Sequence, residues 1–534
     1  MRFFNTAGPV RRDIHYCLPP LERINLEEVL TLIEQQKFFV LHAPRQTGKT
    51  SCLLALMEYL NKDGRYRALY VNLEAAQAAR ENVDSAMRAI LGEIAGEAGS
   101  ILDDPYPRKI RQEVLDEQGA HGALGTLLSL WAQNNPKPLV VMMDEIDALV
   151  GDTLISVLRQ LRAGYAKRPG RFPQSVILCG VRDVRDYRIH SGSEKAMITG
   201  GSAFNVKAAS LRLGDFSRSE VEVLFGQHTE ETGQRFAPDA VETVWELSRG
   251  QPWLVNALGY ETCFQIREGR DRSRLIAADL IIEARENLIQ RRETHLDQLV
   301  DKLQEERVRR VVSPILEGTS MVSSVSQDDI SYVVDLGLVA KGPAGFFIAN
   351  PIYGEIIPRE LSYITQLNME PLFQPAWYVD ADGRLNVNKL LFAFQEFFRE
   401  HSEHWVERFQ YKEAGPQLLL QAFLQRIVNG GGRIEREYGL GRMRTDLLII
   451  WPVRDGTGQV REKQKGVIEL KILHRSLDET ISLGLGQTFE YMQRCAAAEG
   501  HLVVFDRAPE KSWDEKIFRR DERFREVSIT VWGM

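Results

Sequence analysis

Cysteine is scarce in this sequence and is never clustered. The 534 residues contain five, at Cys17, Cys52, Cys179, Cys263 and Cys495. A disulfide framework or a thiolate zinc site needs paired or closely spaced cysteines, so neither is expected. Long apolar runs are also missing: no stretch approaches the ~18 uncharged residues that a membrane span needs, and the first twelve residues lack the apolar segment of a secretory signal. These absences predict a cytoplasmic protein that does not contact a membrane.

An excess of positive charge is missing too. Lys and Arg number 67 against 74 Asp and Glu, for a net charge of −7. That balance does not indicate a protein that binds nucleic acid through its overall charge. The hydrophobic share of 44% is ordinary for a globular protein and excludes wholesale disorder. Because single cores stop growing near roughly 250–300 residues, about two to four domains are expected.

Apolar, strand-like runs alternate with helical stretches over the first two hundred residues. The runs predicted as strands are 37–42, 67–73, 138–143 and 175–179. Amphipathic segments, such as 50–61 and 83–98, lie between them. Continuously apolar strands separated by helices predict an α/β fold with a parallel sheet covered on both faces.

A phosphate-binding loop is indicated directly after the first run. The segment Ala-Pro-Arg-Gln-Thr-Gly-Lys-Thr at 43–50 matches G-x-x-x-x-G-K-[ST], except that Ala43 replaces the first glycine. Backbone N–H groups of such a loop and of the helix that follows form an anion site. In this pattern Lys49 reaches the β- and γ-phosphates, and the Thr50 hydroxyl binds Mg²⁺. The predicted nucleotide-binding residues are Ala43, Pro44, Arg45, Gln46, Thr47, Gly48, Lys49, Thr50 and Ser51.

An acidic pair ends the third run. Asp144 is predicted to hold Mg²⁺, and Glu145 to polarise the attacking water as a general base. Alone, this motif could equally be a buried strand with a solvated acidic end. Together with the loop at 43–50 it predicts a site for ATP and Mg²⁺.

Polar residues after two other runs are further candidates. Arg182, Arg185 and Arg188 follow the fourth run. They could contact the γ-phosphate, in cis or in trans, or form a solvated basic loop. Asn72 and Glu74 end the second run on the same side of the predicted sheet and are candidates for touching the water or the metal.

Several of these motifs together resemble a known class. Asp144-Glu145-Ile146-Asp147, Gly250-Gln251-Pro252-Trp253 and the tail from Asp335-Leu336-Gly337-Leu338 to Asn350-Pro351-Ile352-Tyr353 resemble the archaeal-ATPase-like branch of the STAND P-loop NTPases, a class similar to AAA+ proteins. The opening from His15-Tyr16 through the loop at 43–50 resembles bacterial "AAA-like domain" ATPases. The resemblance covers about 1–361. It implies a helical lid, and an ATP-driven switch in which a winged helix packs on the ATPase and moves.

The last 130 residues have a different pattern of predicted helices and strands. A helix at 416–428 is predicted to be followed by strands at 433–438, 445–451 and 466–472, a helix at 477–498 and strands at 501–505 and 527–532. Period 2 places Val467, Glu469 and Lys471 on one face, and the neighbouring strand offers Asp446. Carboxylate oxygens suit Mg²⁺ or Mn²⁺. The metal would make a nucleophilic water, which Lys471 could orient.

This order of elements resembles the PD-(D/E)XK nuclease superfamily, RecB-like branch. The resemblance implies that Asp446, Glu469 and Lys471 are catalytic, with Asp446 and Glu469 as metal ligands, and that Gln487 and Tyr491 are auxiliary. Glu413 and Glu437 are weaker acidic candidates. Arg442 and Arg444 could contact the DNA backbone without reading sequence. The alternative is a domain of this fold with an inert site.

Five regions are therefore predicted. They are a P-loop NTPase core (1–210), a helical lid (211–290), a winged helix-turn-helix (291–365), a linker with a docking helix (366–404) and a nuclease-like domain of PD-(D/E)XK type (405–534). The expected function is an ATPase switch controlling a metal-dependent nuclease, acting on DNA rather than RNA, in a homo-oligomer or with a partner protein. The resemblance implies a role in bacterial defence. The alternatives are an ATP-dependent scaffold that does not cut and a winged-helix DNA-binding regulator.

Overall fold

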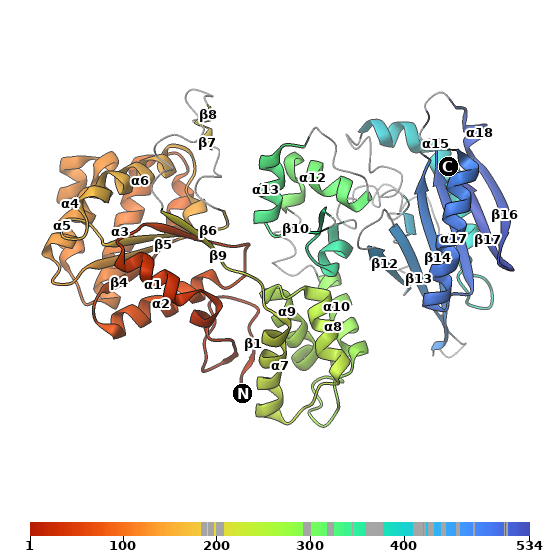
Figure 1. The fold of residues 1–534 in the computed structure, drawn as a ribbon, viewed down its shortest axis with the longest axis horizontal. Coiled ribbons are helices and arrows are strands. Elements are labelled where there is room, and N and C mark those ends of the chain that lie inside the picture. The colour runs from red at the N-terminus through yellow and green to blue at the C-terminus, as the bar shows by residue number, and fades with distance from the viewer. Residues whose placement is uncertain are drawn as a thin grey trace. The chain divides into compact units, whose positions relative to one another are not determined.

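The computed structural model divides the chain into two compact units. Unit 1 comprises Met1–His295 with Ser331–Leu338, and unit 2 comprises Leu296–Ile330 with Val339–Met534 (Figure 1). The structure describes residues 1–182, 189–190, 197–198, 208–291, 301–317, 325–343, 345–357, 377–408, 420, 423–424, 432–438, 445–454, 460–473, 476–506, 508 and 511–534. No helix among these residues has the length and apolar character needed to cross a membrane.

Unit 1 is built on a five-stranded parallel sheet. Its strands are β3 (Phe39–His42), β4 (Arg67–Asn72), β5 (Leu139–Asp144), β6 (Ser175–Gly180) and β9 (Ala209–Arg212), and their order is β4-β5-β6-β3-β9. All neighbouring pairs run parallel. Because β5 and β6 are buried along their whole length, their runs are continuously apolar. The predicted parallel α/β sheet is confirmed, with strand ends shifted by one or two residues.

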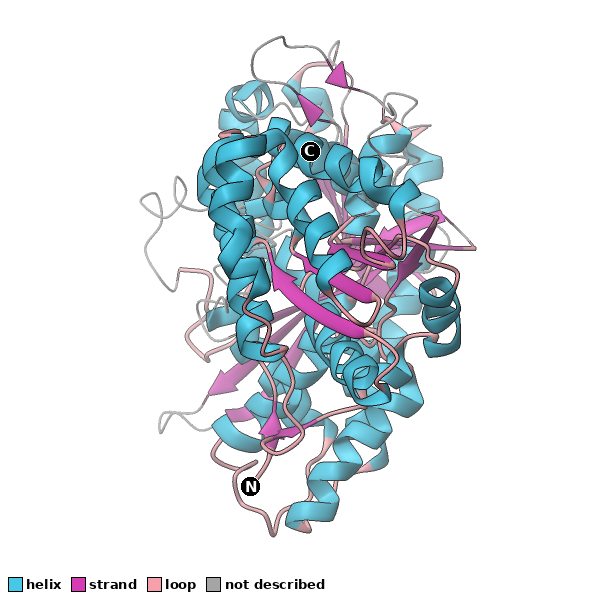
Figure 2. Cartoon of the chain, turned by 90° about the vertical axis from the view of Figure 1, so that its left-hand side faces the viewer, coloured by secondary structure: helices cyan, strands magenta, loops and turns pink. Residues whose placement is uncertain are grey.

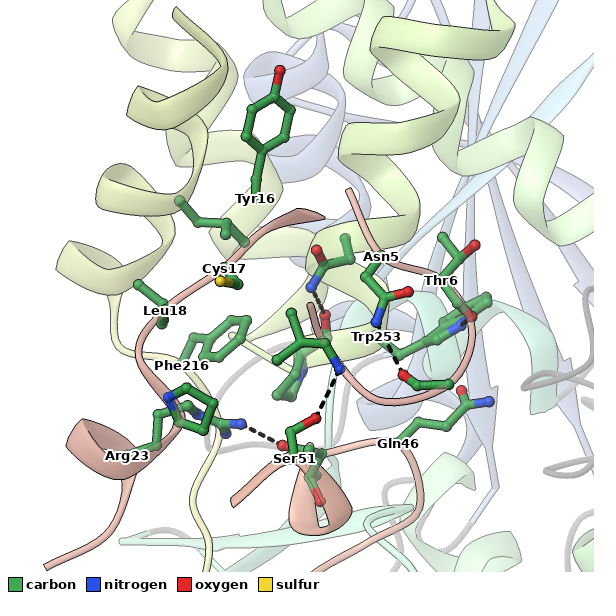
Figure 3. Close-up of a pocket in the computed structure, with 18 of the residues that line it drawn as sticks. Asn5, Thr6, Tyr16, Cys17, Leu18, Arg23, Gln46, Ser51, Phe216 and Trp253 are labelled. Carbon is green, nitrogen blue, oxygen red and sulfur yellow. Dashed lines mark hydrogen bonds between the residues drawn. The ribbon is translucent and has the colours of Figure 1, made fainter. Parts of the chain in front are cut away.

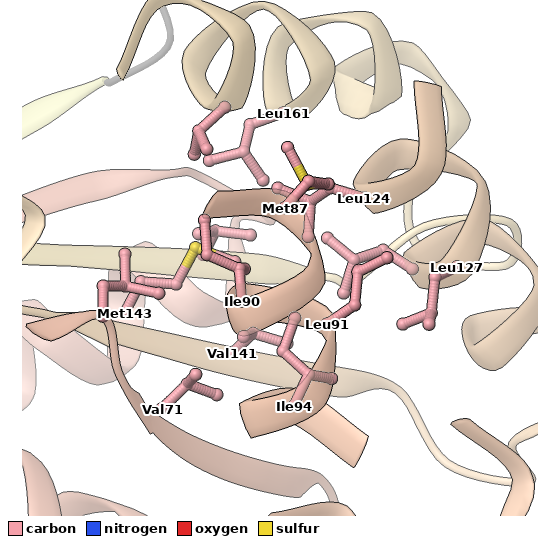
Figure 4. Packing of buried hydrophobic residues seen from close by; sticks show 14 of the residues in the cluster. Val71, Met87, Ile90, Leu91, Ile94, Leu124, Leu127, Val141, Met143 and Leu161 are labelled. Atoms are coloured by element: carbon pink, nitrogen blue, oxygen red, sulfur yellow. The ribbon is translucent and has the colours of Figure 1, made fainter. Parts of the chain in front are cut away.

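Helices cover both faces of this sheet, as Figure 2 shows with helices in cyan and strands in magenta. One face packs against α3 (Val83–Ile101), α4 (Tyr106–Gln118), α5 (Ala120–Asn134) and α6 (Gly151–Gly164). Figure 4 shows Met87, Ile90 and Leu91 of α3 meeting residues of α5 and of the strands. The other face packs against α1 (Leu26–Glu34) and α2 (Lys49–Asp63). The sheet is therefore held between two separate apolar clusters.

A helical segment follows the sheet in unit 1. It contains α7 (Arg218–Thr232), α8 (Pro238–Ser248), α9 (Pro252–Tyr260) and α10 (Ala278–Arg291). Ser217 and Glu220 form the capping box that their spacing predicts at the start of α7. The N-terminal strands β1 (Phe3–Phe4) and β2 (His15–Tyr16) pair in parallel, and the Phe4 ring lies 4.8 Å from that of Phe225 in α7. The first residues of the chain are thus packed into the helical segment.

Two helices and a hairpin lead into the remainder of unit 2. They are α12 (Glu306–Glu317), α13 (Gln327–Asp335) and the antiparallel strands β10 (Val339–Gly342) and β11 (Gly345–Ile348). Arg307 of α12 pairs with Asp328 and Asp329 of α13, at 3.1 and 3.3 Å. Helix α13 contributes its last residues to unit 1.

A six-stranded mixed sheet forms the core of unit 2. Its order is β12-β13-β14-β15-β17-β16, with strands at Arg433–Tyr438, Thr445–Arg454, Val460–Ile472, Glu499–Phe505, Val527–Gly533 and Phe518–Phe524 respectively. Helix α17 (Leu477–Cys495) joins β14 to its parallel neighbour β15. The pairing of β13 with β14 stays regular from Asp446 to Val453 and shifts register between Val453 and Arg454. A short helix, α18 (Trp513–Lys516), precedes β16.

The sheet of unit 2 has an apolar cluster on each face. One contains Ile481 and Leu485 of α17. The other contains Leu390, Phe394 and Phe398 of α15 (Val387–Arg408) together with strand residues. The apolar stripe that these residues form on α15 therefore packs inside the same core as the sheet. Strand β16 was not expected, because its exposed edge carries charged side chains instead of an apolar pattern.

Candidate functional site

The loop after β3 has the geometry of an anion site. Helix α2 starts at Lys49, and the Gly48 before it has φ +96°, a left-handed conformation that favours glycine. Ala43 is fully buried in the apolar cluster beneath the loop, which explains why a small non-glycine residue is accepted there. The Lys49 ammonium is buried and donates to the Ala43 and Pro44 carbonyls, both at 3.0 Å. The loop thus encloses the cation predicted to meet the phosphates.

Strand β5 delivers the acidic pair beside this loop. Asp144 is completely buried, and its Oδ2 accepts the Thr50 hydroxyl at 2.7 Å. The same oxygen accepts the Tyr70 hydroxyl at 3.1 Å, while Oδ1 accepts the Glu145 backbone N–H at 2.9 Å. The two residues predicted to serve Mg²⁺, Thr50 and Asp144, are therefore in direct contact. Such hydroxyl and carboxylate oxygens fit a hard cation.

Glu145 has an unusual backbone and an altered acidity. Its φ of +55° lies in the left-handed region, which non-glycine residues seldom adopt and which is common at functional sites. Burial raises the pKa of the Glu145 carboxyl, and the nearby Asp147 and Asp144 raise it further. Asn72 stands opposite Asp144 in the register of β4 and β5, and its side chain accepts the Glu74 backbone N–H at 2.8 Å.

Arg182 is engaged by another part of unit 1. Its Nε lies 3.3 Å from Oδ2 of Asp335, and its guanidinium stacks 4.9 Å from the Tyr332 ring centroid. Burial raises the pKa of Asp335. In the same segment Gly337 passes so close to the phosphate-binding loop that a Cβ there would lie 2.8 Å from Pro44. The end of α13 thus lies against the loop. Arg185 and Arg188 fall outside the described residues.

A cavity of about 130 Å³ opens beside the loop (Figure 3). Three parts of unit 1 line it: the N-terminal segment, the loop with the first turn of α2, and the helical segment. The lining includes Asn5, Arg23, Gln46, Ser51, Phe216 and Trp253. The Val10 backbone N–H donates to the Ser51 hydroxyl at 3.0 Å, and the Trp253 indole donates to the Thr6 carbonyl at 2.9 Å. The first residues of the chain therefore form one wall of the cavity.

Sequence reasoning missed Tyr70, Arg23 and the N-terminal residues of this cavity. No motif marks the N-terminal residues, since their contacts join positions more than forty apart in the chain. Tyr70 left one signal, a hydroxyl inside an otherwise apolar run two residues before Asn72.

The second candidate site lies on the sheet of unit 2. Asp446 of β13 stands directly opposite Glu469 of β14, and Glu437 of β12 directly opposite Asp446. Directly opposed residues share a face of the sheet. The Glu469 side chain is fully buried, and the Lys471 ammonium donates to its Oε1. The register of β13 and β14 therefore places the three residues predicted to be catalytic, Asp446, Glu469 and Lys471, at neighbouring positions on the sheet.

The other residues predicted for this site have different outcomes. Tyr491 of α17 is buried in the same apolar cluster as Val467 of β14, and the buried Gln487 Oε1 has no hydrogen-bond partner among the described residues. Glu413, Arg442 and Arg444 lie outside the described residues. No group of three His, Cys, Asp or Glu suited to a metal occurs among the described side chains, which do not include those of Glu437 and Asp446.

Comparison with known proteins bears on the first site. Residues 32–187 match the AAA domain family, and no curated protein matches the chain. The Walker-type ATPase of Pyrococcus abyssi is 15% identical, with 66% of this chain and 99% of that one covered, at a TM-score of 0.45.

Two further solved structures are similar to part of the chain. Cdc6p from Pyrobaculum aerophilum has 17% identity, coverage of 69% and 98%, and a TM-score of 0.37. The RuvB Holliday junction branch migration motor of Thermotoga maritima has 13% identity, coverage of 63% and 96%, and a TM-score of 0.33. Residues 32–187 thus match the AAA domain family, and the parallel sheet with its phosphate-binding loop has the fold of a P-loop NTPase.

Proposed function

We propose that this protein hydrolyses ATP with Mg²⁺ in unit 1, and that ATP controls a metal-dependent nuclease-like site in unit 2. The observation that carries the first part is the 2.7 Å hydrogen bond from Thr50 to Asp144. It places a hydroxyl and a carboxylate together at the start of α2, where the phosphates bind in P-loop proteins.

The residues of unit 1 divide the work of hydrolysis. Lys49 leaves its two carbonyl partners to meet the β- and γ-phosphates. Thr50 and Asp144 hold the Mg²⁺. Glu145 accepts a proton from the attacking water, and its raised pKa suits this role because a general base works best near the operating pH. Arg182 contacts the γ-phosphate only after it gives up Asp335.

The nuclease proposal rests on the register of β13 and β14. Asp446 and Glu469 would hold Mg²⁺ or Mn²⁺, since two carboxylates on neighbouring strands suit a hard cation. The bound metal supplies a nucleophilic water and stabilises charge on the phosphate. Lys471 orients that water or neutralises the scissile phosphate, with Gln487 and Tyr491 supporting from α17. The substrate is DNA rather than RNA, and the protein works as a homo-oligomer or with a partner protein.

One observation favours a second candidate, an ATP-dependent scaffold whose last domain does not cut. Lys471 already neutralises the buried Glu469 carboxylate, so the pair is stable without a metal. A third candidate, a DNA-binding regulator led by a winged helix formed by α12, α13 and the hairpin, is weaker because β10 and β11 together carry a single lysine, Lys341.

Cleavage and hydrolysis assays on the whole chain separate these candidates. Plasmid and linear DNA are incubated with Mg²⁺ or Mn²⁺, each with and without ATP, while phosphate release is followed in parallel. The proposal expects ATP hydrolysis that Lys49→Ala abolishes, and nicking that depends on the metal and responds to ATP. Hydrolysis without nicking under any metal or nucleotide condition would leave the scaffold as the better description. DNA retention that is lost on deleting the β10–β11 hairpin would favour the regulator.

A further inference from the structure

Arg23 is a partly buried cation that lacks a carboxylate partner among the side chains that the structure describes. Its Nη1 donates to the Thr47 carbonyl, and its Nη2 donates to the Gly214 carbonyl at 2.8 Å. The guanidinium stacks 4.6 Å from the Phe216 ring centroid. No described Asp or Glu lies within ion-pair distance of it. Burial lowers the pKa of Arg23, yet an arginine stays protonated in proteins.

Removing part of a charge from water costs free energy when its hydrogen-bond partners are neutral, and such a charge is commonly balanced by an anion. The two carbonyl bonds occupy two of the five N–H groups of the guanidinium. Asp215 and Glu220 act on Arg23 only from a longer range. The missing counter-charge is therefore expected from something that binds at this place.

The location of Arg23 indicates what that anion is. Arg23 lines the cavity together with Gln46, Gly48 and Ser51, which belong to the phosphate-binding loop and the first turn of α2. A Cβ on Gly48 would lie 2.6 Å from the Arg23 Nη1. The guanidinium therefore lies directly against the backbone of the loop at Gly48. An anion held by the loop would lie next to Arg23.

We propose that Arg23 is a further binding residue of the nucleotide site, whose guanidinium compensates the phosphate chain of a nucleoside di- or triphosphate from the cavity side. This proposal rests on nucleotide binding at the loop. The bond from Arg23 to Gly214 lies just before α7, so the residue that meets the phosphates also holds the entry to the helical segment. Arg23 thereby connects nucleotide occupancy with the position of that segment.

The test compares ligands that differ only in phosphate content. Dissociation constants of adenosine, AMP, ADP and ATP are measured for the whole chain and for Arg23→Gln, Arg23→Lys and Arg88→Gln. Arg88 is an exposed control that pairs with Asp84 on the same unit. Since hydrogen bonds to charged groups contribute about 1.5–3 kcal/mol, Arg23→Gln should raise the dissociation constants of ADP and ATP by about 10- to 100-fold. The dissociation constant of adenosine should change less than threefold in Arg23→Gln. The Arg88→Gln variant should bind all four ligands as the wild type does.

Three results would overturn this role. Equal losses for adenosine and ADP would make Arg23 a purely structural clamp, and unchanged ADP binding in Arg23→Gln would remove it from the site. If Arg23→Gln does not fold, Arg23→Lys decides the question. Lysine keeps the charge but loses the planar fork, so the preference for ADP over adenosine should fall partway, and an unchanged preference contradicts the proposal. Failure of the wild type to bind any nucleotide would instead count against the proposed ATPase itself.

Discussion

Arg182, which follows strand β6 and is buried, forms an ion pair with the partly buried Asp335 at the end of helix α13, with 3.3 Å between Nε and Oδ2. Arg182 is the residue proposed to meet the γ-phosphate, so a phosphate and a carboxylate compete for one guanidinium. ADP lacks the phosphate in question and leaves the ion pair intact. A ligand that binds more tightly when the Arg182–Asp335 ion pair is broken also favours the broken pair, because the two free energies are linked.

The substitution Asp335→Asn removes the carboxylate that competes with the γ-phosphate for Arg182. We expect the variant to bind ATP severalfold more tightly relative to ADP, because Arg182 no longer has to leave a carboxylate. The ratio of the two dissociation constants measures this effect. Asp84→Asn, which breaks an exposed ion pair on the same unit, is the matched control. An unchanged ratio in Asp335→Asn would show that Arg182 does not meet the γ-phosphate.

Tyr70 positions Asp144. Its hydroxyl donates to the oxygen that also accepts the Thr50 hydroxyl, so Tyr70→Phe leaves that carboxylate with one hydrogen bond fewer. We expect the Mg²⁺ concentration that gives half-maximal ATP hydrolysis to rise about two- to tenfold, given about 0.5–1.5 kcal/mol for such a bond. Tyr59→Phe, at a partly exposed position on α2, should leave the Mg²⁺ requirement unchanged. A lower kcat at an unaltered Mg²⁺ requirement would contradict this role.

The raised pKa of Glu145 predicts how the rate of ATP hydrolysis depends on pH. Burial and then Asp147 and Asp144 raise the pKa of its carboxyl. A protonated glutamate cannot accept a proton from water, so kcat should fall on acidification at a higher pH than an exposed glutamate would give. Asp147→Asn removes a neighbouring negative charge and should move this limb of the profile to lower pH. The measurement is kcat against pH.

A binding measurement on Glu145→Gln provides the control for this assignment. The variant should keep ATP affinity and lose turnover at every pH, because only the proton acceptor is removed. Turnover at the wild-type rate would mean that another group takes the proton.

The site in unit 2 is tested by Asp446→Asn and Lys471→Ala. Either change should end metal-dependent cleavage, since one removes a ligand charge and the other removes the cation beside the water. ATP hydrolysis should stay nearly intact, because the residues proposed for it belong to unit 1. Asp514→Asn is the matched control, because Asp514 and Lys516 have the same spacing as Glu469 and Lys471. The Asp514 side chain is 82% exposed. Nicking by Asp446→Asn at the wild-type rate would exclude the proposed metal site.

Contacts that are local in sequence, or that follow a strand period, were predictable here. The loop at 43–50, the acidic pair after β5 and the capping box at Ser217 all depend on a few neighbouring residues. The sequence predicted Asp446 and Glu469 on neighbouring strands, whereas the register that sets them directly opposite each other comes from the structure. These parts of the fold carry their own signal in residue type and spacing.

The remainder depends on contacts between distant segments. Arg23 bonds the Gly214 carbonyl across 191 positions, and Arg182 pairs across 153 positions with Asp335. In the sequence, no residue next to either arginine or to its partner indicates that such a contact forms. Helix α15 looked like a separate docking helix because its apolar stripe does not reveal which sheet covers it. Strand β16 was missed because an edge strand needs few apolar residues.

The register shift between Val453 and Arg454 also limits how this protein can change over evolution. Any extra residue there lies beyond the regular part of the β13–β14 pairing, so the far end of the hairpin can lengthen or shorten while Asp446 keeps its place. One residue inserted between Asp446 and Val453 would instead turn Asp446 to the opposite face of the sheet. Among homologues, length variation in this hairpin should therefore gather at its tip, and the eight positions from 446 to 453 should keep a constant length even where their side chains diverge.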